Sequence, residues 1–361
     1  MKNQESKRKM LYLAFALMMT IAMTSTATAK SWRINNNTSL KPHFTTINAA
    51  MSSDEVQDGD TLYLDPGCTL SSTQTVSKAV TVVGTGYFLD ALPYNQASIT
   101  GTLTISAEKS KLVGISSEIV NINANNVAIE RCQISFIESS KSNIIIRSSF
   151  IRGNHTHSYN SDVRYKVGIH GSDYWTIENC IIIGTCGHTT TPTISGLKYS
   201  TIRNNYIRRF NFEGYSSGYS GYFQIPVIDN ISNCELTNNI IINESPYSSS
   251  YVFGNLNSCI VTNNILSCGT LSSYPINKYS ATTSSVFVSS GSNDLAYKLS
   301  STSPAKGYAT DGGDCGPYGS GYTYVPSGLP FGHPYYTQIQ VGSPAQKGKL
   351  NVTYKVKVQD E

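Results

Sequence analysis

Short runs of alternating apolar and polar residues recur along the chain from about residue 80 to residue 290. One repeated unit has the form of Thr176–Ile182, in which the second and seventh residues are aliphatic. No 3.6-residue period fits these segments, and runs of Ile and Val broken by Asn, Gly and Ser are typical of strands. We therefore predict a series of short β-strands. The second positions of the six clearest copies are Ile129, Ile146, Ile177, Ile202, Leu236 and Val261, with looser copies near Val82 and Leu112.

The spacing of these copies predicts a solenoid. Successive second positions are 17, 31, 25, 34 and 25 residues apart. A coil of about 25 residues with one inward apolar side chain can bury it only by stacking on its neighbours, which then lie ~4.8 Å away. The fourth position, where the chain must turn, favours a residue that tolerates the left-handed conformation and can form a stacked ladder. Asn occupies it in four copies, at Asn179, Asn204, Asn238 and Asn263.

The ends of the chain fit the same interpretation. Residues 43–51 predict a short amphipathic helix, and Asp58–Gly67 predict a strand that ends in a turn. An open solenoid end exposes core and unpaired backbone, so it needs a cap. With these features the sequence resembles the pectate-lyase-like right-handed β-helix proteins exported by diderm bacteria, and Tyr297–Tyr318 resembles the segment that closes many of them. The resemblance implies a fold but not one activity, because such proteins include lyases, hydrolases, epimerases and non-enzymes.

We therefore predict an all-β fold, a single-stranded right-handed parallel β-helix with a short N-terminal capping helix and an extended C-terminal tail. The expected divisions are a signal peptide (1–29), the cap and first strand (30–70), the β-helix (71–323) and the tail (324–361). In the tail, Leu350–Val358 alternates apolar and polar residues and predicts one terminal strand. The tail is either a small appendage or a segment packed along the solenoid.

The N-terminus predicts export. Four basic residues precede an apolar stretch from Met10 to about Ala22, and Ala27 and Ala29 provide the small residues of a cleavage site. We expect a periplasmic, cell-surface or extracellular protein without a transmembrane anchor. Cleavage after Ala29 removes the four basic residues and Glu5, leaving 23 basic against 22 acidic residues. This near-neutral balance disfavours a nucleic-acid partner.

Acidic residues are scarce where a carboxylate-based enzyme would need them. Between residues 91 and 290 the Asp residues are Asp162, Asp173 and Asp229, no two of them close in sequence. Pectinase-type hydrolysis needs paired carboxylates, and a Ca²⁺-dependent lyase needs several acidic ligands. Other acidic residues have structural interpretations. Glu130 and Glu178 alternate with Arg147 and Arg203 in a charge ladder across adjacent strands, and Asp311 and Asp314 have turn roles.

No metal or cofactor site is predicted. His155 and His157 could bind a metal if their loop is extended, but an exposed His pair in a loop rich in Ser and Asn is more often inert. The chain has eight Cys and no Cys-x-x-Cys, which disfavours structural zinc. Cys234 and Cys259 occupy equivalent positions in consecutive coils, so they form either a disulfide or a stack of thiols. Cys132 and Cys180 are two coils apart and too distant to pair.

Two long coils carry the candidate chemistry. Both insertions follow the same column, at Arg152 and Arg208, so the loops leave one edge of the solenoid about 10 Å apart. From Ile146 to Arg209 there are eight basic residues and three acidic ones. Cations and aromatic rings suit an acidic sugar chain. The predicted binding residues are Arg152, His155, His157, Arg208, Arg209, Tyr215, Tyr219 and Tyr222, and the catalytic candidates are Arg164, Lys166, His170 and Tyr219.

The leading hypothesis is an exported protein that binds an anionic or neutral polysaccharide along this edge. A second hypothesis is a lyase acting on uronic-acid polymers, in which Lys, Arg, His or Tyr takes the C5 proton and neutralises the carboxylate. A third is a structural or adhesive surface solenoid without catalysis. The sequence leaves open whether the protein is an enzyme, which glycan it binds, and its oligomeric state.

Overall fold

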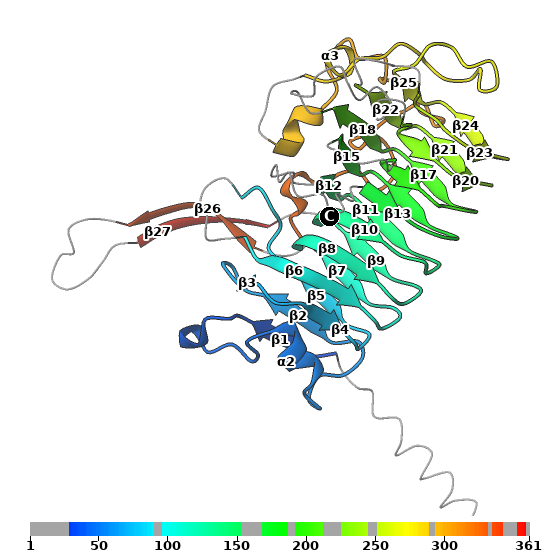
Figure 1. The fold of residues 1–361 in the computed structure, drawn as a ribbon. Helices are drawn as coiled ribbons and strands as arrows, with labels where there is room; N and C mark the ends of the chain where they lie inside the picture. The colour runs from blue at the N-terminus through cyan, green and yellow to red at the C-terminus, as the bar shows by residue number, and fades with distance from the viewer. Residues whose placement is uncertain are drawn as a thin grey trace, which may run out of the picture.

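The computed structural model describes residues 29–89, 96–152, 168–186, 192–211, 225–244, 251–288, 293–330, 334–341 and 352–358. Within these ranges the chain is mostly short β-strands, with two short α-helices, α2 (Ile47–Met51) and α3 (Thr283–Val286). The two large sheets are parallel throughout. The fold is all-β and compatible with a β-helix or solenoid, as Figure 1 shows. No helix in the described ranges is long and apolar enough to cross a membrane.

Two parallel sheets run the length of the stack, and each coil of the chain contributes to both. Sheet A has the spatial order β1 (Ser31–Ile34), β2 (Thr61–Leu64), β5 (Thr81–Val83), β7 (Lys111–Val113), β9 (Ala128–Glu130), β11 (Ile145–Arg147), β14 (Thr176–Glu178), β17 (Thr201–Arg203), β21 (Glu235–Thr237) and β24 (Ile260–Thr262). Sheet B begins with β3 (Thr69–Leu70), β4 (Gln74–Val76), β6 (Ser98–Ile105), β8 (Ser116–Ile122) and β10 (Gln133–Glu138).

Beyond β10, sheet B divides into two parallel rows. One row is β12 (Phe150–Arg152), β15 (Ile181–Cys186), β18 (Tyr206–Asn211), β22 (Ile240–Asn243) and β25 (Ile265–Leu266). The other is β13 (Gly168–His170), β16 (Ile194–Ser195) and β19 (Ile228–Asp229). β12 pairs with the first half of β10 and β13 with its second half, so the segment between β12 and β13 interrupts what was one strand in the preceding coil. A small pair, β20 (Ile231–Ser232) with β23 (Leu256–Asn257), lies outside these sheets.

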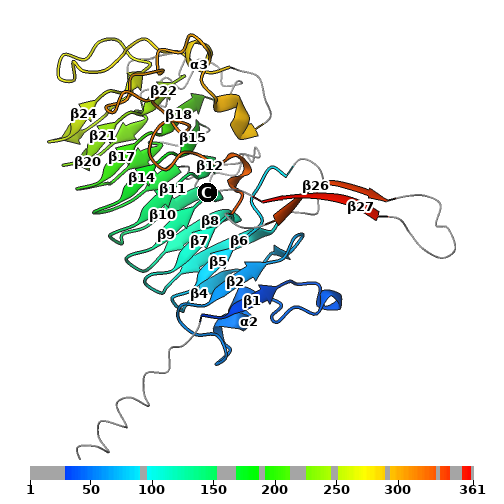
Figure 2. The same ribbon diagram turned by 180° about the vertical axis from the view of Figure 1, so that it is seen from behind.

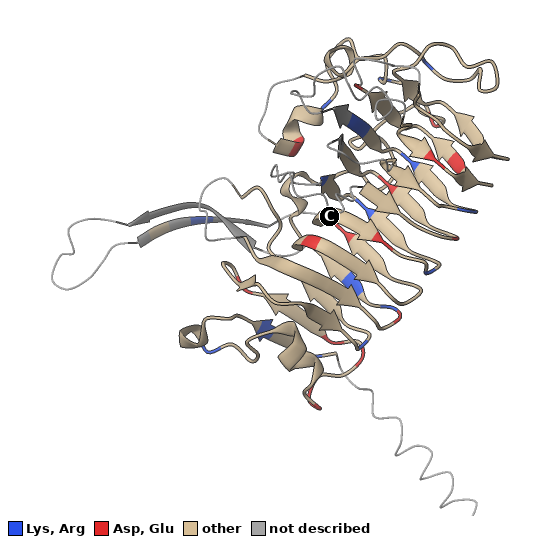
Figure 3. Ribbon diagram, in the orientation of Figure 1, with Lys and Arg blue, Asp and Glu red and all other residues tan. Residues whose placement is uncertain are grey.

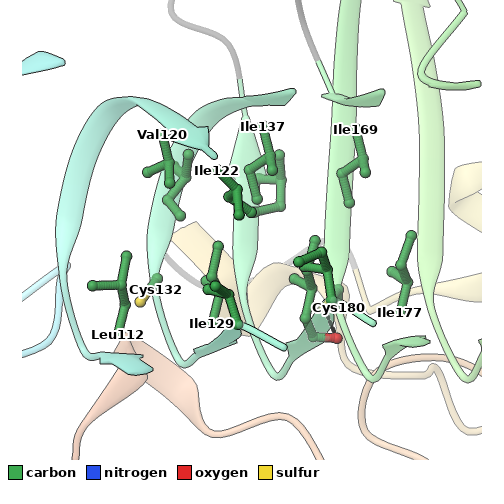
Figure 4. Packing of buried hydrophobic residues seen from close by; sticks show 14 of the residues in the cluster. Leu112, Val120, Ile122, Ile129, Cys132, Ile137, Ile169, Ile177 and Cys180 are labelled. Atoms are coloured by element: carbon green, nitrogen blue, oxygen red, sulfur yellow. Dashed lines mark hydrogen bonds between the residues drawn. The ribbon is translucent and has the colours of Figure 1, made fainter. Parts of the chain in front are cut away.

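The strand register confirms the predicted aliphatic column. Ile146 pairs with Ile129 on one side and Ile177 on the other. The same register continues through Ile202 to Leu236 and Val261, and backwards through Leu112 and Val82. All of these side chains are buried. Figure 4 shows Leu112, Ile129 and Ile177 pointing toward Val120, Ile137 and Ile169 of the opposite sheet, so the two sheets close one apolar core.

The turn after each sheet A strand is also as predicted. Asn179, Asn204, Asn238 and Asn263 have φ between 51° and 60°, the left-handed conformation that Asn tolerates well. The side-chain ladder, however, lies mainly one residue further on. Asn205 donates its Nδ2 to Asn239 Oδ1 at 3.0 Å, and Asn239 donates to Asn264 Oδ1 at 3.0 Å. The left-handed residues instead bind the C-terminal segment.

The C-terminal segment packs back along the outside of the stack. Asn179 Nδ2 donates to Pro317 O at 3.0 Å, and Val325 N–H donates to Ser148 Oγ at 2.7 Å. A second apolar cluster lies between this segment and the outer face of sheet B, and it includes Tyr206, Phe287 and Tyr324. Of the predicted tail, residues 324–329 therefore lie along the stack.

Beyond that segment the chain forms a hairpin. β26 (Pro334–Val341) pairs antiparallel with β27 (Val352–Val358), and the pair projects away from the stack in both views (Figures 1 and 2). The terminal strand is confirmed, whereas β26 was not predicted, because the prolines at 326, 330 and 334 were interpreted as an irregular extended stretch.

Charges on sheet A form the predicted ladder. Glu178 is paired with Arg147 on one side and with Arg203 on the other, where Arg203 Nη2 lies 2.5 Å from Glu178 Oε2. Glu130 pairs with Lys111 at 2.7 Å. In Figure 3 blue and red segments alternate from strand to strand along this sheet. Because Glu130 and Glu178 are buried, they are structural groups in this conformation.

Candidate functional site

Seven of the predicted site residues lie outside the described residues: His155, His157, Arg164, Lys166, Tyr215, Tyr219 and Tyr222. Arg152, His170, Arg208 and Arg209 are described. The roots of the two long insertions are placed by the strand register. Arg152 pairs with Ile183, and Ile183 pairs with Arg208, so the two insertion points are equivalent and two strands apart.

The three described arginines have different environments. Arg152 is exposed and keeps its place as a predicted binding residue. Arg208 forms an ion pair with Glu244, and its side chain is only 18% exposed. Arg209 is 2% exposed. The expectation that Arg208 and Arg209 reach out to a ligand therefore differs from the structure, because the adjacent strand supplies a carboxylate for one and the fold buries the other.

His170 lies in an open groove at the C-terminal ends of four sheet B strands. The groove has a volume of about 580 Å³. It is formed by the last residues of β8, β10, β13 and β16 and by the turns that follow them. The described lining residues are Asn121, Ile122, Asn123, Glu138, Ser139, Ser140, His170, Gly171, Ser172, Ser195 and Gly196.

Polar residues in register form a continuous row along this groove. Asn121 pairs with Glu138, Glu138 with His170, and His170 with Ser195. Neighbouring members are therefore one strand spacing apart, ~4.8 Å. The next residue in the register, Asp229, accepts the Asn255 N–H at 2.6 Å and does not line the groove. The row presents amide, carboxylate, imidazole and hydroxyl groups at regular intervals across the stacked strands.

The orientation of His170 is set by two contacts. Its ring packs edge-on against Phe136, with centroids 5.3 Å apart and planes at 86°. Its Nε2 lies 3.2 Å from Pro192 O. Because a carbonyl oxygen can only accept, this contact assigns the proton to Nε2, and Nδ1 is then the nitrogen that can accept one. Glu138 and His170 are neighbours in adjacent strands.

Two glycines keep the groove floor low. A Cβ on Gly171 would lie 2.4 Å from Leu197 Cδ2, inside the core. Gly196 has φ +79°, and a Cβ there would lie 2.8 Å from Gly171 O. The backbone joins the coils directly at this level, where Ser139 N–H donates to His170 O and Gly171 N–H to Ser195 O, each at 3.0 Å. A side chain at either glycine would disturb the floor between Glu138 and Ser195.

Glu138 and Ser195 were not among the predicted site residues, although the sequence contained a signal for them. An aliphatic residue followed by a polar one recurs where the second row of sheet B forms, as in Ile137–Glu138 and Ile169–His170. The next copies are Ile194–Ser195 and Ile228–Asp229. Aligning these dipeptides would have placed all four polar residues on one line.

The described lining is close to neutral, with Glu138 and His170 as its ionisable side chains and without Lys or Arg. Within the described residues no group of three or more His, Cys, Asp or Glu could hold a metal ion.

The other candidates resolve into structural roles. Asp311 accepts the Gly313 N–H at 3.0 Å and Asp314 accepts the Gly307 N–H at 2.9 Å, which confirms that both stabilise turns. Cys234 and Cys259 are free thiols in this structure, and burial raises the pKa of Cys234 to about 11. Of the two alternatives for this pair, a disulfide or a stack of thiols, the structure has the thiols.

No protein-family model matches this chain, and no match is found among curated proteins.

Proposed function

We propose that this protein is an exported right-handed parallel β-helix protein of the pectate-lyase-like kind, and that it binds polysaccharide in the groove formed by β8, β10, β13 and β16. Parallel strands that alternate between two sheets support the β-helix. Right-handedness follows from the strong preference of parallel crossover connections for that hand. On this interpretation α2, which contacts β4, belongs to the N-terminal cap, and residues 1–29 are the signal peptide.

The observation that carries the proposal is the row from Asn121 to Ser195 in an open groove of about 580 Å³. Polysaccharides are linear arrays of hydroxyl groups at regular spacing. A groove that repeats donors and acceptors every ~4.8 Å along one axis can hydrogen-bond successive units of such a chain. The first long insertion ends where β13 begins, and loops on a rigid scaffold commonly carry binding residues.

The test is retention of the mature protein, residues 30–361, on an array of neutral and acidic polysaccharides. We expect wild type to be retained and Glu138→Gln with His170→Ala to be retained at least about tenfold more weakly, since both remove polar anchors from the centre of the groove. Glu55→Gln is the matched control, because Glu55 is exposed and lies outside the groove. Absence of retention by wild type would instead favour the structural or adhesive solenoid.

A lyase is the second candidate, and the adjacency of Glu138 and His170 in the register favours it, because carboxyl and imidazole groups are common proton carriers in catalysis. In that case His170 would take the proton from C5 of a uronic acid, and cations from the insertions would neutralise the carboxylate. The C4–O bond to the neighbouring sugar would break as the C4–C5 double bond forms, and the leaving oxygen would take its proton from water. Incubation with uronic-acid polymers would then produce the ultraviolet absorbance of an unsaturated uronate. Activity that survived His170→Ala, Lys166→Ala and Tyr219→Ala would rule out this assignment of the site.

A further inference from the structure

Two exposed tyrosine rings stack on each other near the groove. Tyr174 and Tyr199 are 55% and 53% exposed. Their ring centroids are 5.4 Å apart and their planes are inclined by only 19°. Each tyrosine precedes a sheet A strand by two residues, in adjacent coils, and Tyr174 N–H donates to Lys198 O at 2.9 Å. Because the rings face each other, the aromatic surface of the pair consists of the two outer ring faces and the ring edges, and it is fixed to the rigid stack.

The fold does not require tyrosine at these positions. Both have left-handed backbone, with φ of 61° and 50°, which is unusual for a bulky side chain. Asn adopts this conformation at lower cost because its short polar side chain is tolerated there. Asn would therefore serve folding better than Tyr at both positions. The equivalent left-handed positions of other coils are occupied by Lys109, Asn126, Asn143, Asn233 and Ser258.

The tyrosines are within reach of a ligand that fills the groove. Ser172 and Gly196 line its end. Tyr174 follows Ser172 by two residues and Tyr199 follows Gly196 by three, so the Cα separations are at most about 7 and 11 Å. That distance is comparable to one or two sugar rings, so a chain that leaves the groove toward the turns can reach the aromatic surface.

We propose that Tyr174 and Tyr199 form an aromatic subsite on which sugar rings of a neutral polysaccharide stack as the chain leaves the groove. This inference rests on the proposed function and specifies its substrate class. The outer ring faces of the stacked pair can pack against the apolar C–H faces of pyranose rings. The described lining of the groove contains the carboxylate of Glu138 and no Lys or Arg, so it disfavours a polyanion.

The test uses isothermal titration of the mature protein with neutral cello-, manno- and xylo-oligosaccharides and with acidic oligogalacturonates, each of increasing length. The double variant Tyr174→Asn/Tyr199→Asn installs the residue that adjacent coils have at this position. Leu40→Asn is the control, because Leu40 is also an exposed apolar residue and lies in the N-terminal part of the chain, away from both tyrosines in sequence. We expect the double variant to bind long oligomers about tenfold more weakly and disaccharides as wild type does, the size expected when aromatic anchors are removed. Its melting temperature should be equal to or above that of wild type.

Equal affinity of wild type and double variant for every oligomer would overturn the subsite and leave the groove proposal standing. A lowered melting temperature with unchanged affinity would show that the ring pair serves folding. Binding of acidic chains alone would overturn the assignment of a neutral glycan. If wild type bound no glycan of any kind, the proposed function itself would fail.

Discussion

Asn239 is the centre of a buried amide ladder, and replacing it with Ala should cost the fold about 4 kcal/mol. Its Nδ2 donates to Ile202 O at 2.7 Å and to Asn264 Oδ1 at 3.0 Å. Its Oδ1 accepts from both the backbone N–H and the Nδ2 of Asn205, each at 3.0 Å. The side chain is fully buried. Asn239→Ala removes four hydrogen bonds, each with a net value of roughly 1 kcal/mol, and leaves Ile202 O and Asn205 N–H without these partners.

The measurement is equilibrium unfolding in urea, followed by circular dichroism, together with amide hydrogen exchange. Exchange should accelerate most in β18 and β22, because stability in a stacked fold is carried by contacts between neighbouring coils. Asn257→Ala, at an exposed position, should change stability by no more than about 0.5 kcal/mol.

Asn239→Ser should cost less than Asn239→Ala, since Ser149 in an earlier coil accepts the Cys132 N–H with its hydroxyl at 3.1 Å. A loss below about 1 kcal/mol for Asn239→Ala would refute the reasoning, because an unpaired buried group alone should exceed it.

Two further predictions concern folding. Ile177→Asp buries an unpaired charge in the aliphatic column and should abolish cooperative unfolding, whereas Ile177→Val should not; a cooperative transition for the Asp variant would contradict the stacked core. Burial raises the pKa of Asp294, so the folded state favours the protonated acid, and the resulting stability is lost as pH rises from the ordinary Asp value of 3.8 through the raised pKa. Asn at this position can still accept from Tyr324 OH and Ser327 N–H. The melting temperature of Asp294→Asn relative to wild type should therefore increase between pH 4 and pH 7, and a constant difference would contradict this.

The aliphatic column and its turns could be predicted because they repeat. Ile177 and its equivalents stack on their counterparts in adjacent coils, so a repeat along the sequence is enough to predict this contact. The same holds for the left-handed Asn at 179 and for the charge ladder through Glu178. In each case a residue type recurs at the same offset within the unit, and the parallel register then brings the copies together.

The groove and the C-terminal segment could not be predicted in the same way. Glu138 and His170 are 32 positions apart because an insertion separates β12 from β13, although the two residues are neighbours in the register. The C-terminal segment is held partly through its backbone, as in the bond from Asn179 to Pro317 O, and a backbone carbonyl leaves no mark in a residue pattern. The sequence does not show which Asn of the turn forms the side-chain ladder, because Asn occupies both positions in three coils. The predicted position, the first, is one residue before the observed one.

Hydrogen exchange of the mature protein with and without a panel of soluble polysaccharides tests the groove most directly. The account predicts protection concentrated in peptides that cover residues 116–123, 133–140 and 168–172, with at least one polysaccharide, and loss of that protection in Glu138→Gln/His170→Ala. Absence of protection with every polysaccharide, or protection confined to other parts of the chain, would contradict the account.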